Sequence, residues 1–520
     1  MPDSAAHLPS KATLLARARA LLAQPDMADV GHSEYDAGFL ARVAKPGTRE
    51  PAFPEVLEVV RTTQAEDGGW AAEVDYVSAR LLATLSSMLA VTEFDSGPEA
   101  RARAARAEAF ILKSWPRLKD EPDLTIGFEL VAAPLLAEVC ERGFNKLSAL
   151  SAAAEALHKE KMSRVPPQML YAPHLSLGFS LEFLRDKLDV EQTRKLQTAN
   201  GLVGSSVATT SHFIRMSGDE RALRGLRELV DRRGPRSIPF GTGTELWQRL
   251  WISYHLHMAG MTAELQQELK PHLEAIRSHT QAFGLAWSSE VAYGDSDDTS
   301  VSSGLLHDHG YEVNWKLLAQ YERPDGFVGF LVERGASVSA NAHVLDAIQG
   351  RPYPGGKESV DKSARFLLGQ RRPDGFWTDK WHASPYYVTS RSTRALLRWE
   401  PSCVVPSVQW LQANQRTDGG WGWFGRSSPE ETAYALHALA AARLAGLSVD
   451  TGILTQGAAY LAPYDGSESA DLHPKLWIAK GLYRPLHVVR STVLAAQAMC
   501  ARALDLDGAL AESARVAAAR

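Results

Sequence analysis

Apolar residues recur at helical spacing along most of the chain. In residues 429–445, the apolar positions from Ala433 to Ala440 follow i, i+3/i+4 and i+7 spacing, which puts them on one helical face. Pro429 and the two glutamates after it are typical of a helix start, because acids are stabilised at the positive end of the helix dipole. Comparable stripes occur at residues 80–90, 128–140, 341–349 and 490–504. Alternating strand patterns are scarce, so the chain is predicted to be all-α.

A turn motif of Gln, Asp, Gly and an aromatic residue separates these helices. It reads QAEDGGW at 64–70, QRRPDGFW at 370–377 and QRTDGGW at 415–421, with a weaker copy, RPDGF, at 323–327. The last three copies recur every 44 to 49 residues, about one helical hairpin each, which is typical of repeat architectures. We expect Gln and the ring to close the turn, Asp to cap the next helix and Gly to be left-handed. We interpret these turns as stabilising elements without chemistry.

Two proline-containing segments, 44–54 and 233–243, indicate boundaries between helical units. One copy of the turn motif lies between these segments, and three copies follow the second segment. The simplest division of the chain is therefore into two helical units.

Composition narrows the class of protein. The chain has 520 residues, 56 basic against 61 acidic side chains and a net charge of −5, which does not favour a nucleic-acid partner. Three widely spaced cysteines suit a reducing cytosol, so we expect a cytoplasmic protein. No uncharged apolar run reaches about 18 residues, so no membrane span is predicted. Thirteen tryptophans and 39 glycines are an unusual feature, partly explained by the turn motif.

An acidic cluster, Asp295-Ser-Asp297-Asp298, is the strongest candidate for chemistry. A solvated loop or helix cap could also carry three acids, but this cluster follows an apolar and aromatic stretch at residues 284–294. Crowded carboxylates in a low-dielectric site cannot all ionise, so at least one keeps its proton. The cluster therefore predicts a proton donor.

The D-x-D-D cluster and the repeated turns together resemble the class II terpene cyclases. The resemblance is to copalyl- and halimadienyl-type diterpene cyclases and, more distantly, to squalene–hopene cyclases. Further matching segments follow in family order at residues 33–36, 123–129, 337–345, 379–387, 430–434 and 476–484. The resemblance implies two α-α barrels. A discontinuous β domain, 1–45 plus 275–520, would carry the acids, and a γ domain, 46–274, would be inserted into it.

The resemblance also implies roles for individual residues. Asp297 would be the general acid, and Asp295 and Asp298 would hold it protonated and oriented. Aromatic faces stabilise a migrating carbocation without attacking it. The candidate substrate-lining residues are Trp287, Tyr293, Trp315, Trp381, Tyr386, Tyr387, Asn341 and His343, although a single ring is more often plain core.

A substrate diphosphate would stay attached, since initiation by protonation needs no ionisation, and neither a DDxxD nor an NDxxSxxxE motif is present. By resemblance, Lys161 and Arg164 would bind the diphosphate, with Lys480 and Arg484 as further candidates; ordinary surface charge is the alternative for each. Asp120, Glu121 and Asp123 resemble an acidic motif associated with Mg²⁺, although a charged helix-start loop is an equal alternative.

One segment departs from the family pattern. Plant copalyl diphosphate synthases carry a histidine linked to the terminating base in a segment that here reads LGFSLE, with Phe179 at the histidine position. Asn200 resembles the asparagine of that dyad. The plant route of deprotonation is therefore not implied for this chain.

The leading hypothesis is an enzyme that protonates geranylgeranyl or farnesyl diphosphate and forms a bicyclic prenyl diphosphate of the copalyl or drimenyl type. A downstream phosphatase or class I synthase would then use the product. Two alternatives remain open: a cyclase of a neutral polyene such as squalene, and a non-catalytic α-α barrel that binds a partner.

Overall fold

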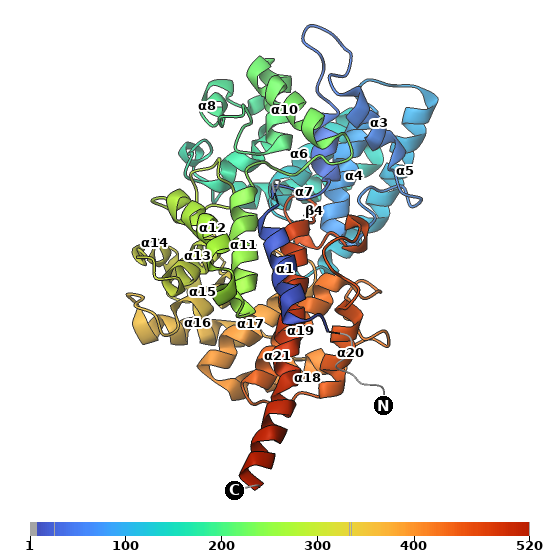
Figure 1. Cartoon of the computed structure of the whole chain (residues 1–520). Helices are drawn as coiled ribbons and strands as arrows, with labels where there is room; N and C mark the ends of the chain where they lie inside the picture. Colours follow the sequence, from blue (N-terminus) through green and yellow to red (C-terminus); the bar gives the residue numbers. More distant parts are fainter. Residues whose placement is uncertain (1–7, 25–26, 332, 334, 519–520) are drawn as a thin grey trace.

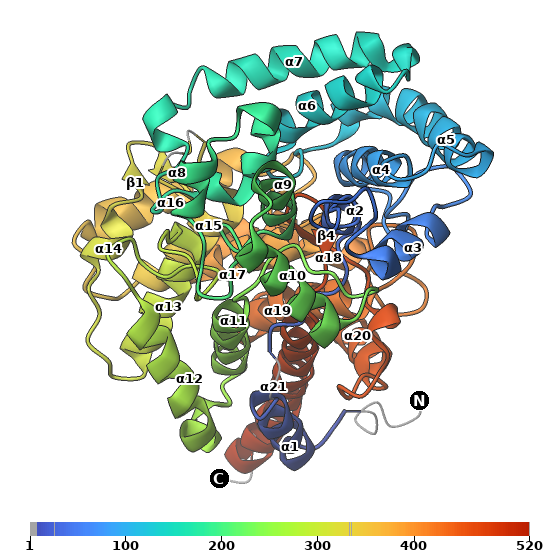
Figure 2. The same cartoon turned by 90° about the horizontal axis from the view of Figure 1, so that it is seen from above.

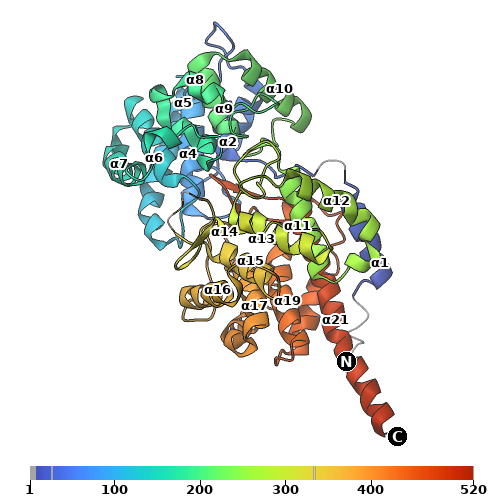
Figure 3. The ribbon, with the colours of Figure 1, turned by 90° about the vertical axis from the view of Figure 1, so that its left-hand side faces the viewer.

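The computed structural model describes residues 8–24, 27–331, 333 and 335–518. Its helices form two groups, seen one above the other in Figure 3. Each group has its own hydrophobic core. The largely helical prediction is confirmed, and the few short strands pair as two antiparallel hairpins, β1 (Glu322–Arg323) with β2 (Gly326–Phe327) and β3 (Trp477–Ile478) with β4 (Leu482–Tyr483).

The lower group in Figure 1 is an α-α barrel, which we call the acid barrel. Its inner helices pack in the order α11, α13, α15, α17, α19 and α21, and α21 returns to α11, so the ring closes. These helices are α11 (Glu245–Met258), α13 (Ser296–Asp308), α15 (Val338–Ile348), α17 (Pro385–Trp399), α19 (Pro429–Leu444) and α21 (Leu486–Ala518). Outside them lie α1 (Lys11–Leu22), α12 (Gln266–His279), α14 (Lys316–Ala319), α16 (Gly356–Gln370), α18 (Val405–Ala413) and α20 (Thr451–Leu461), with η6 (Thr262–Glu264), η7 (Pro401–Val404) and η8 (Ala470–Leu472).

The upper group closes in the same way, and we call it the second barrel. Its inner ring runs through α2, α4, α6, η5 and α9 and returns to α2, while α7 lies along the outer side of α6 (Figure 2). Its inner elements are α2 (Glu34–Leu40), α4 (Val77–Val91), α6 (Phe128–Glu141), η5 (Ser176–Lys187) and α9 (Val207–Ser217). Its outer elements are α3 (Pro54–Thr62), α5 (Pro98–Ser114), α7 (Ser148–Met162), α8 (Val190–Arg194) and α10 (Glu220–Arg233), with η2 (Trp115–Asp120), η3 (Asn145–Leu147) and η4 (Pro167–Met169).

The observed boundaries between the two cores differ from the predicted boundaries at residues 45 and 274. Tyr35 to Val43 pack in the second barrel, while α11 and α12 pack in the acid barrel. Of the two proline-containing segments, 233–243 lies next to the change of core, because the second core ends at Ile238. The segment 44–54 instead lies within the second barrel, where Pro54 begins α3.

The turn motif has the same structural role in both barrels. In each full copy the indole Nε1 donates to a carbonyl ten residues earlier, at 2.7 to 2.8 Å. This bond ties the turn to the preceding outer helix. Gly419 has φ +85°, and a Cβ there would lie 2.7 Å from the Gln456 carbonyl, so both the conformation and the close approach require glycine. The aspartate differs from expectation, because Asp418 accepts from the Gly420 N–H within its own turn rather than capping the next helix.

Among the described residues, no helix has both the length and the apolar character needed to cross a membrane.

We expect Trp421→Ala to lower the melting temperature substantially, because Trp421 is completely buried and its indole bonds to the Leu411 carbonyl. Truncation of a buried tryptophan costs about 3–5 kcal/mol. Trp423→Ala is the matched control, since Trp423 lies two residues away and is 47% exposed. Thermal and denaturant unfolding of both variants would measure the difference. Equal destabilisation by the two substitutions would contradict the structural role of the turn.

Candidate active site

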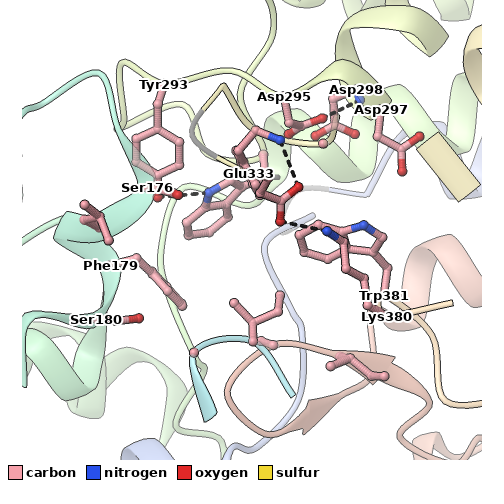
Figure 4. A pocket seen from close by; sticks show the side chains of 18 of the residues that line it. Ser176, Phe179, Ser180, Tyr293, Asp295, Asp297, Asp298, Glu333, Lys380 and Trp381 are labelled. Carbon is pink, nitrogen blue, oxygen red and sulfur yellow. Dashed lines mark hydrogen bonds and ion pairs between the residues drawn. The ribbon is translucent and has the colours of Figure 1, made fainter. Parts of the chain in front are cut away.

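A cavity of about 530 Å³ lies between the two barrels and is lined by residues of both. Leu130 and Leu177 face it from the second barrel, and Trp251 and Trp477 face it from the acid barrel. Its wall is mostly apolar and aromatic, with acids and cations at a few places (Figure 4). This is the composition expected of a site for a long apolar ligand with a polar end.

The acid cluster lies at the start of α13. Asp295 is the N-cap residue, and its carboxylate accepts from the Asp298 N–H at 2.7 Å. All three acids line the cavity (Figure 4). Asp295 and Asp298 are buried, whereas 18% of the Asp297 side chain is exposed. Asp297 is therefore the acid that a ligand in the cavity can reach most easily.

The cavity keeps this cluster protonated. Burial raises the pKa of Asp295 to about 8, and the neighbouring Asp297 carboxylate adds to the increase. Burial also raises the pKa of Asp298 well above its ordinary value, with further increases from Asp295 and Asp297. The Trp251 indole opposes part of that increase by donating to Asp298 at 3.0 Å. Because these groups titrate together, the cluster holds protons at neutral pH.

His343 pairs with Asp297. Its Nδ1 makes a short contact with Asp297 Oδ1, and its Nε2 is buried without a hydrogen-bond partner. The imidazole packs against Trp251, Tyr254 and Tyr387, with ring centroids 4.9, 6.1 and 6.2 Å away. The α15 helix thus orients Asp297 from one side, and the aromatic rings fix the imidazole.

An aromatic wall extends from the acids. Trp287 donates from its indole to the Tyr293 hydroxyl at 3.2 Å, and both residues line the cavity. Phe179 and Phe240 pack on Trp287 with centroids 5.4 and 5.6 Å away. Aromatic lining of this kind suits stabilisation of a cation, because rings attract positive charge without acting as nucleophiles.

Phe179 occupies this wall, whereas Asn200 does not line the cavity. The Asn200 amide donates to Glu290 at 2.8 Å and to Thr242 at 3.2 Å. The two positions that resemble the plant dyad therefore provide an aromatic face and a bonded amide, and neither offers a free base to the cavity.

Three cations line another part of the cavity, which we call the cationic rim: Lys161, Arg164 and Lys380. Lys161 Nζ lies 3.8 Å from Glu129 Oε1, and Arg164 pairs with Glu160; the two cationic side chains are 42% and 39% exposed. Lys380 Nζ lies 2.7 Å from Glu333 Oε1 and comes from the acid barrel (Figure 4). The rim therefore joins positive charge from both barrels.

Several of the predicted substrate-lining residues do not line the cavity. Trp315 belongs to a separate cluster with Leu318 and Tyr321. Tyr386 packs on Trp410 at 5.2 Å. The Asn341 side chain is fully bonded to the Phe327 and Ser337 backbone, so it has no amide group left for a ligand.

Two predicted cations are also used elsewhere. Lys480 is completely buried and bonds to Glu182 at 2.6 Å, to the Phe179 carbonyl and to Ser206. Arg484 pairs with Glu73 at 3.1 Å and also donates to the His473 carbonyl. These bonds connect segments far apart in sequence, and neither residue lines the cavity. Each is a buried, fixed cation with a structural partner, a distinction that the sequence motif does not contain.

The three acids predicted for Mg²⁺ lie in different surroundings. Glu121 accepts from the N–H groups of Val77 and Ser78 and so caps α4, and Asp120 is exposed. Asp123 alone lines the cavity, and burial raises its pKa to about 6, with a further increase from Asp379. Nowhere in the described chain do three His, Cys, Asp or Glu side chains form a metal-binding group. The residues fit a one-carboxylate site better than a three-carboxylate site.

The structure adds residues that the sequence motifs did not single out. Lys380 lies within a matching segment, and its cationic side chain beside Trp381 was a usable signal. Trp251 bonds to an acid of the cluster, and Trp247 and Trp477 line the cavity. Trp247 and Trp251 are four residues apart on α11, a spacing that puts both indoles on one helical face.

Comparison with known proteins agrees with this geometry. A family model of the squalene-hopene cyclase C-terminal domain matches residues 329–465. The type B diterpene cyclase of Mycobacterium tuberculosis is 29% identical over 502 residues, which cover 92% of this chain and 97% of that protein. The ent-copalyl diphosphate synthase from Streptomyces platensis has a similar structure, with a TM-score of 0.74, 27% identity and coverage of 94% of this chain and 99% of that one.

Plant relatives match over a shorter part of their length. Copalyl diphosphate synthase 1 of Selaginella moellendorffii is 28% identical over 377 residues, which cover 71% of this chain and 50% of that protein. The match thus spans about half the length of such plant relatives. In fold and in sequence the chain is similar to bacterial class II terpene cyclases. Enzymes of this class begin cyclisation by protonating a prenyl substrate.

We expect Asp295→Asn to stabilise the protein at alkaline pH. The folded-state pKa of Asp295 is raised to about 8 from 3.8, so folding favours the protonated form. Protonated Asp295 therefore contributes to the free energy of unfolding below about pH 4, and this contribution is lost as the pH rises toward 8. Asparagine cannot ionise and still serves as an N-cap. Melting temperatures at pH 5, 7 and 9 should show a gain over wild type that grows with pH.

Asp325→Asn is the control for this experiment, because Asp325 is exposed in a turn. It should leave the pH dependence of melting unchanged. A pH-independent effect of Asp295→Asn would contradict the buried, protonated state of the cluster.

Proposed function

We propose that this protein protonates the terminal alkene of a linear prenyl diphosphate and forms a bicyclic product that keeps its diphosphate. The observation that carries the proposal is the placement of Asp297 in an aromatic cavity that also has a cationic rim. Geranylgeranyl diphosphate is the favoured substrate, since the named relatives are a diterpene cyclase and copalyl diphosphate synthases. Farnesyl diphosphate, which would give a drimenyl-type product, is the competitor.

Initiation transfers one proton. His343 Nδ1 contacts Asp297 Oδ1. If Nδ1 is the protonated nitrogen, it donates to Oδ1 and leaves the second carboxyl oxygen of Asp297 to carry the proton for the alkene. The O–H bond breaks as a C–H bond forms, leaving a carboxylate and a tertiary carbocation. Two alkenes then attack in turn and close the rings. Loss of one proton from carbon restores an alkene, so the reaction is an isomerisation, and the acid must regain its proton before the next turnover.

The cavity wall supports the cationic steps. Trp251, Trp287, Trp381, Tyr387 and Trp477 line it, and their π-faces stabilise positive charge without trapping it. The apolar wall also limits the water that could quench the cation. A non-catalytic binding barrel would not need a buried, protonated acid cluster, so we favour the enzyme.

The polar end of the substrate would bind at the cationic rim. Lys161 and Arg164 come from the second barrel and Lys380 from the acid barrel, so a diphosphate would bridge the two barrels. Each rim cation now pairs with a glutamate, Lys380 with Glu333, Lys161 with Glu129 and Arg164 with Glu160. On binding, each cation would exchange its carboxylate partner for phosphate oxygens. A squalene-type polyene has no group for this rim. Charge at this position therefore favours a diphosphate substrate.

Mg²⁺ bound between Asp123 and the diphosphate would supply further counter-charge. A single carboxylate with phosphate oxygens and water is an ordinary Mg²⁺ environment. We propose Asp123 alone for this role. We further propose that the enzyme acts in the cytoplasm and passes its product to a phosphatase or a class I synthase, because the retained diphosphate is the group that such enzymes remove.

We expect Asp297→Asn to lower kcat at least about 100-fold with little change in KM, since loss of a general acid removes a transition-state interaction. Purified enzyme with Mg²⁺ and each prenyl diphosphate, analysed as alcohols by mass spectrometry after phosphatase treatment, would measure this. Asp325→Asn should keep full activity. Absence of cyclised product from wild type with either substrate would refute the proposed function, and activity in Asp297→Asn would refute the acid.

We expect Lys161→Ala to raise KM for the prenyl diphosphate about tenfold while leaving the melting temperature unchanged. Lys159→Ala is the matched control, because Lys159 lies on the same helix, is exposed and pairs only with Glu155 among the described residues. Lys480→Met should instead lower the melting temperature, because it leaves Glu182 buried without its ion-pair partner. A large rise of KM in Lys159→Ala would contradict the specific role of Lys161, because it would show that any positive charge on this helix affects binding of the diphosphate.

A further inference from the structure

Arg391, on α17, packs against Trp251 and Tyr387, which line the acid end of the cavity. It is only 2% exposed. Its Nη2 lies 2.6 Å from His255 Nε2, and its Nη1 lies 3.6 Å from the Met258 sulfur. Its Nε has no hydrogen-bond partner, and in the described part of the chain its guanidinium forms no ion pair with a carboxylate. A buried charge without a counter-ion is costly, so its position calls for an explanation.

Four aromatic rings surround this charge. The guanidinium carbon lies 5.7 Å from the ring centroid of Trp251, 5.4 Å from those of Tyr254 and Tyr387, and 5.3 Å from that of Tyr434. Cation–π attraction to several rings offsets part of the cost of burial. The cage therefore holds a fixed positive charge at one place in the barrel.

The same rings contact the acid machinery. Trp251 donates to Asp298 at 3.0 Å, and Trp251, Tyr254 and Tyr387 pack against His343, the partner of Asp297. One layer of side chains therefore separates the Arg391 charge from the proton donor. The cationic rim, in contrast, includes residues of the second barrel, and Arg391 contacts only residues of the acid barrel.

We propose that Arg391 is a positioning residue that sets the strength of the acid, given the proposed function. Its positive charge stabilises the carboxylate that Asp297 becomes when the proton leaves. The crowded acids hold that proton at rest, and Arg391 stabilises the anion left when it moves. The same charge repels the new carbocation, which favours migration of positive charge along the cavity toward the diphosphate.

The charged and titratable groups on the acid side are Asp295, Asp297, Asp298, Glu333 and His343. Those around Arg391 are His255, His437, Arg394, Asp346, Tyr254, Tyr387 and Tyr434, with Glu430 and His382 next to Tyr434 and Tyr387. Burial, and then Arg391, lowers the pKa of His255 and His437 well below the ordinary value. Burial raises the pKa of Tyr254, Tyr387 and Tyr434. The neutral groups around Arg391 therefore stay neutral near pH 7, and the acid cluster is the group that titrates.

The test is the pH dependence of kcat in Arg391→Met and Arg391→Lys. Activity requires the protonated acid, so kcat falls on the alkaline side. Removal of the positive charge makes the carboxylate less stable, so the fall of kcat on the alkaline side (the alkaline limb) moves to higher pH. The expected shift is about one pH unit for a charge that acts across one layer of side chains at an effective dielectric constant of about 20. On the acid plateau, kcat should fall about three- to tenfold because the acid is weaker. Arg391→Lys should keep the limb in place.

Arg394→Met is the matched control. Arg394 lies three residues further along α17 and donates to Tyr254, but Asp346 balances its charge. It should leave the limb unmoved. Arg391→Gln provides a second neutral variant with a donor for His255, and melting temperatures identify variants that fail to fold.

The role of Arg391 is refuted if the limb is unmoved in a folded neutral variant, or if Arg391→Lys moves it as far as a neutral variant does. A wild-type enzyme that is inactive on every prenyl diphosphate would instead refute the proposed function. The two failures are therefore distinguishable.

Discussion

The rest of this structure depends on one electrostatic constraint: three carboxylates share the start of one helix inside an apolar cavity. Water would allow all three to ionise, whereas burial in the cavity between the barrels raises the pKa of Asp295 to about 8 and raises that of Asp298 well above its ordinary value. The cluster therefore stays protonated only while both barrels exclude solvent. Closure of the inner helical rings and burial of the tryptophans that line the cavity are the conditions for that exclusion.

Those conditions explain why so many large side chains serve the scaffold. Trp70, Trp377 and Trp421 are completely buried, and each ties its turn to the preceding outer helix through the indole N–H. Lys480 and Glu182 form a buried ion pair between segments of the two barrels. Such a pair contributes less to stability than to register, because desolvation offsets much of its attraction. This ion pair thus connects the two barrels close to the cavity, since Lys480 also donates to the carbonyl of the lining residue Phe179.

Sequence reasoning predicted the helical fold and the acid cluster because both leave local patterns, a 3.6-residue periodicity in one case and adjacent residues in the other. It could not separate a cation at the cavity from a cation buried in a structural ion pair. Lys161 and Lys480 look alike in their motifs, yet Lys161 is 42% exposed at the cavity and Lys480 is fully buried against Glu182. The two tryptophans are a similar case, because Trp315 packs in a separate core cluster whereas Trp381 lines the cavity. Such distinctions depend on long-range packing, which spacing does not encode.

The aromatic wall of the cavity bears on how the proposed reaction would end. Phe179, Phe240 and Trp287 pack into one aromatic surface, and Asn200 is held by Glu290 behind it. An aromatic face stabilises a cation but accepts no proton, so in the proposed reaction this part of the cavity would prolong the life of the carbocation. The chain thus pairs a strongly organised proton donor with a wall that offers no base at the two positions resembling the plant dyad. Cavity shape, which sets the positions that a folded polyene can reach, then has more influence on the product than any one residue of this wall.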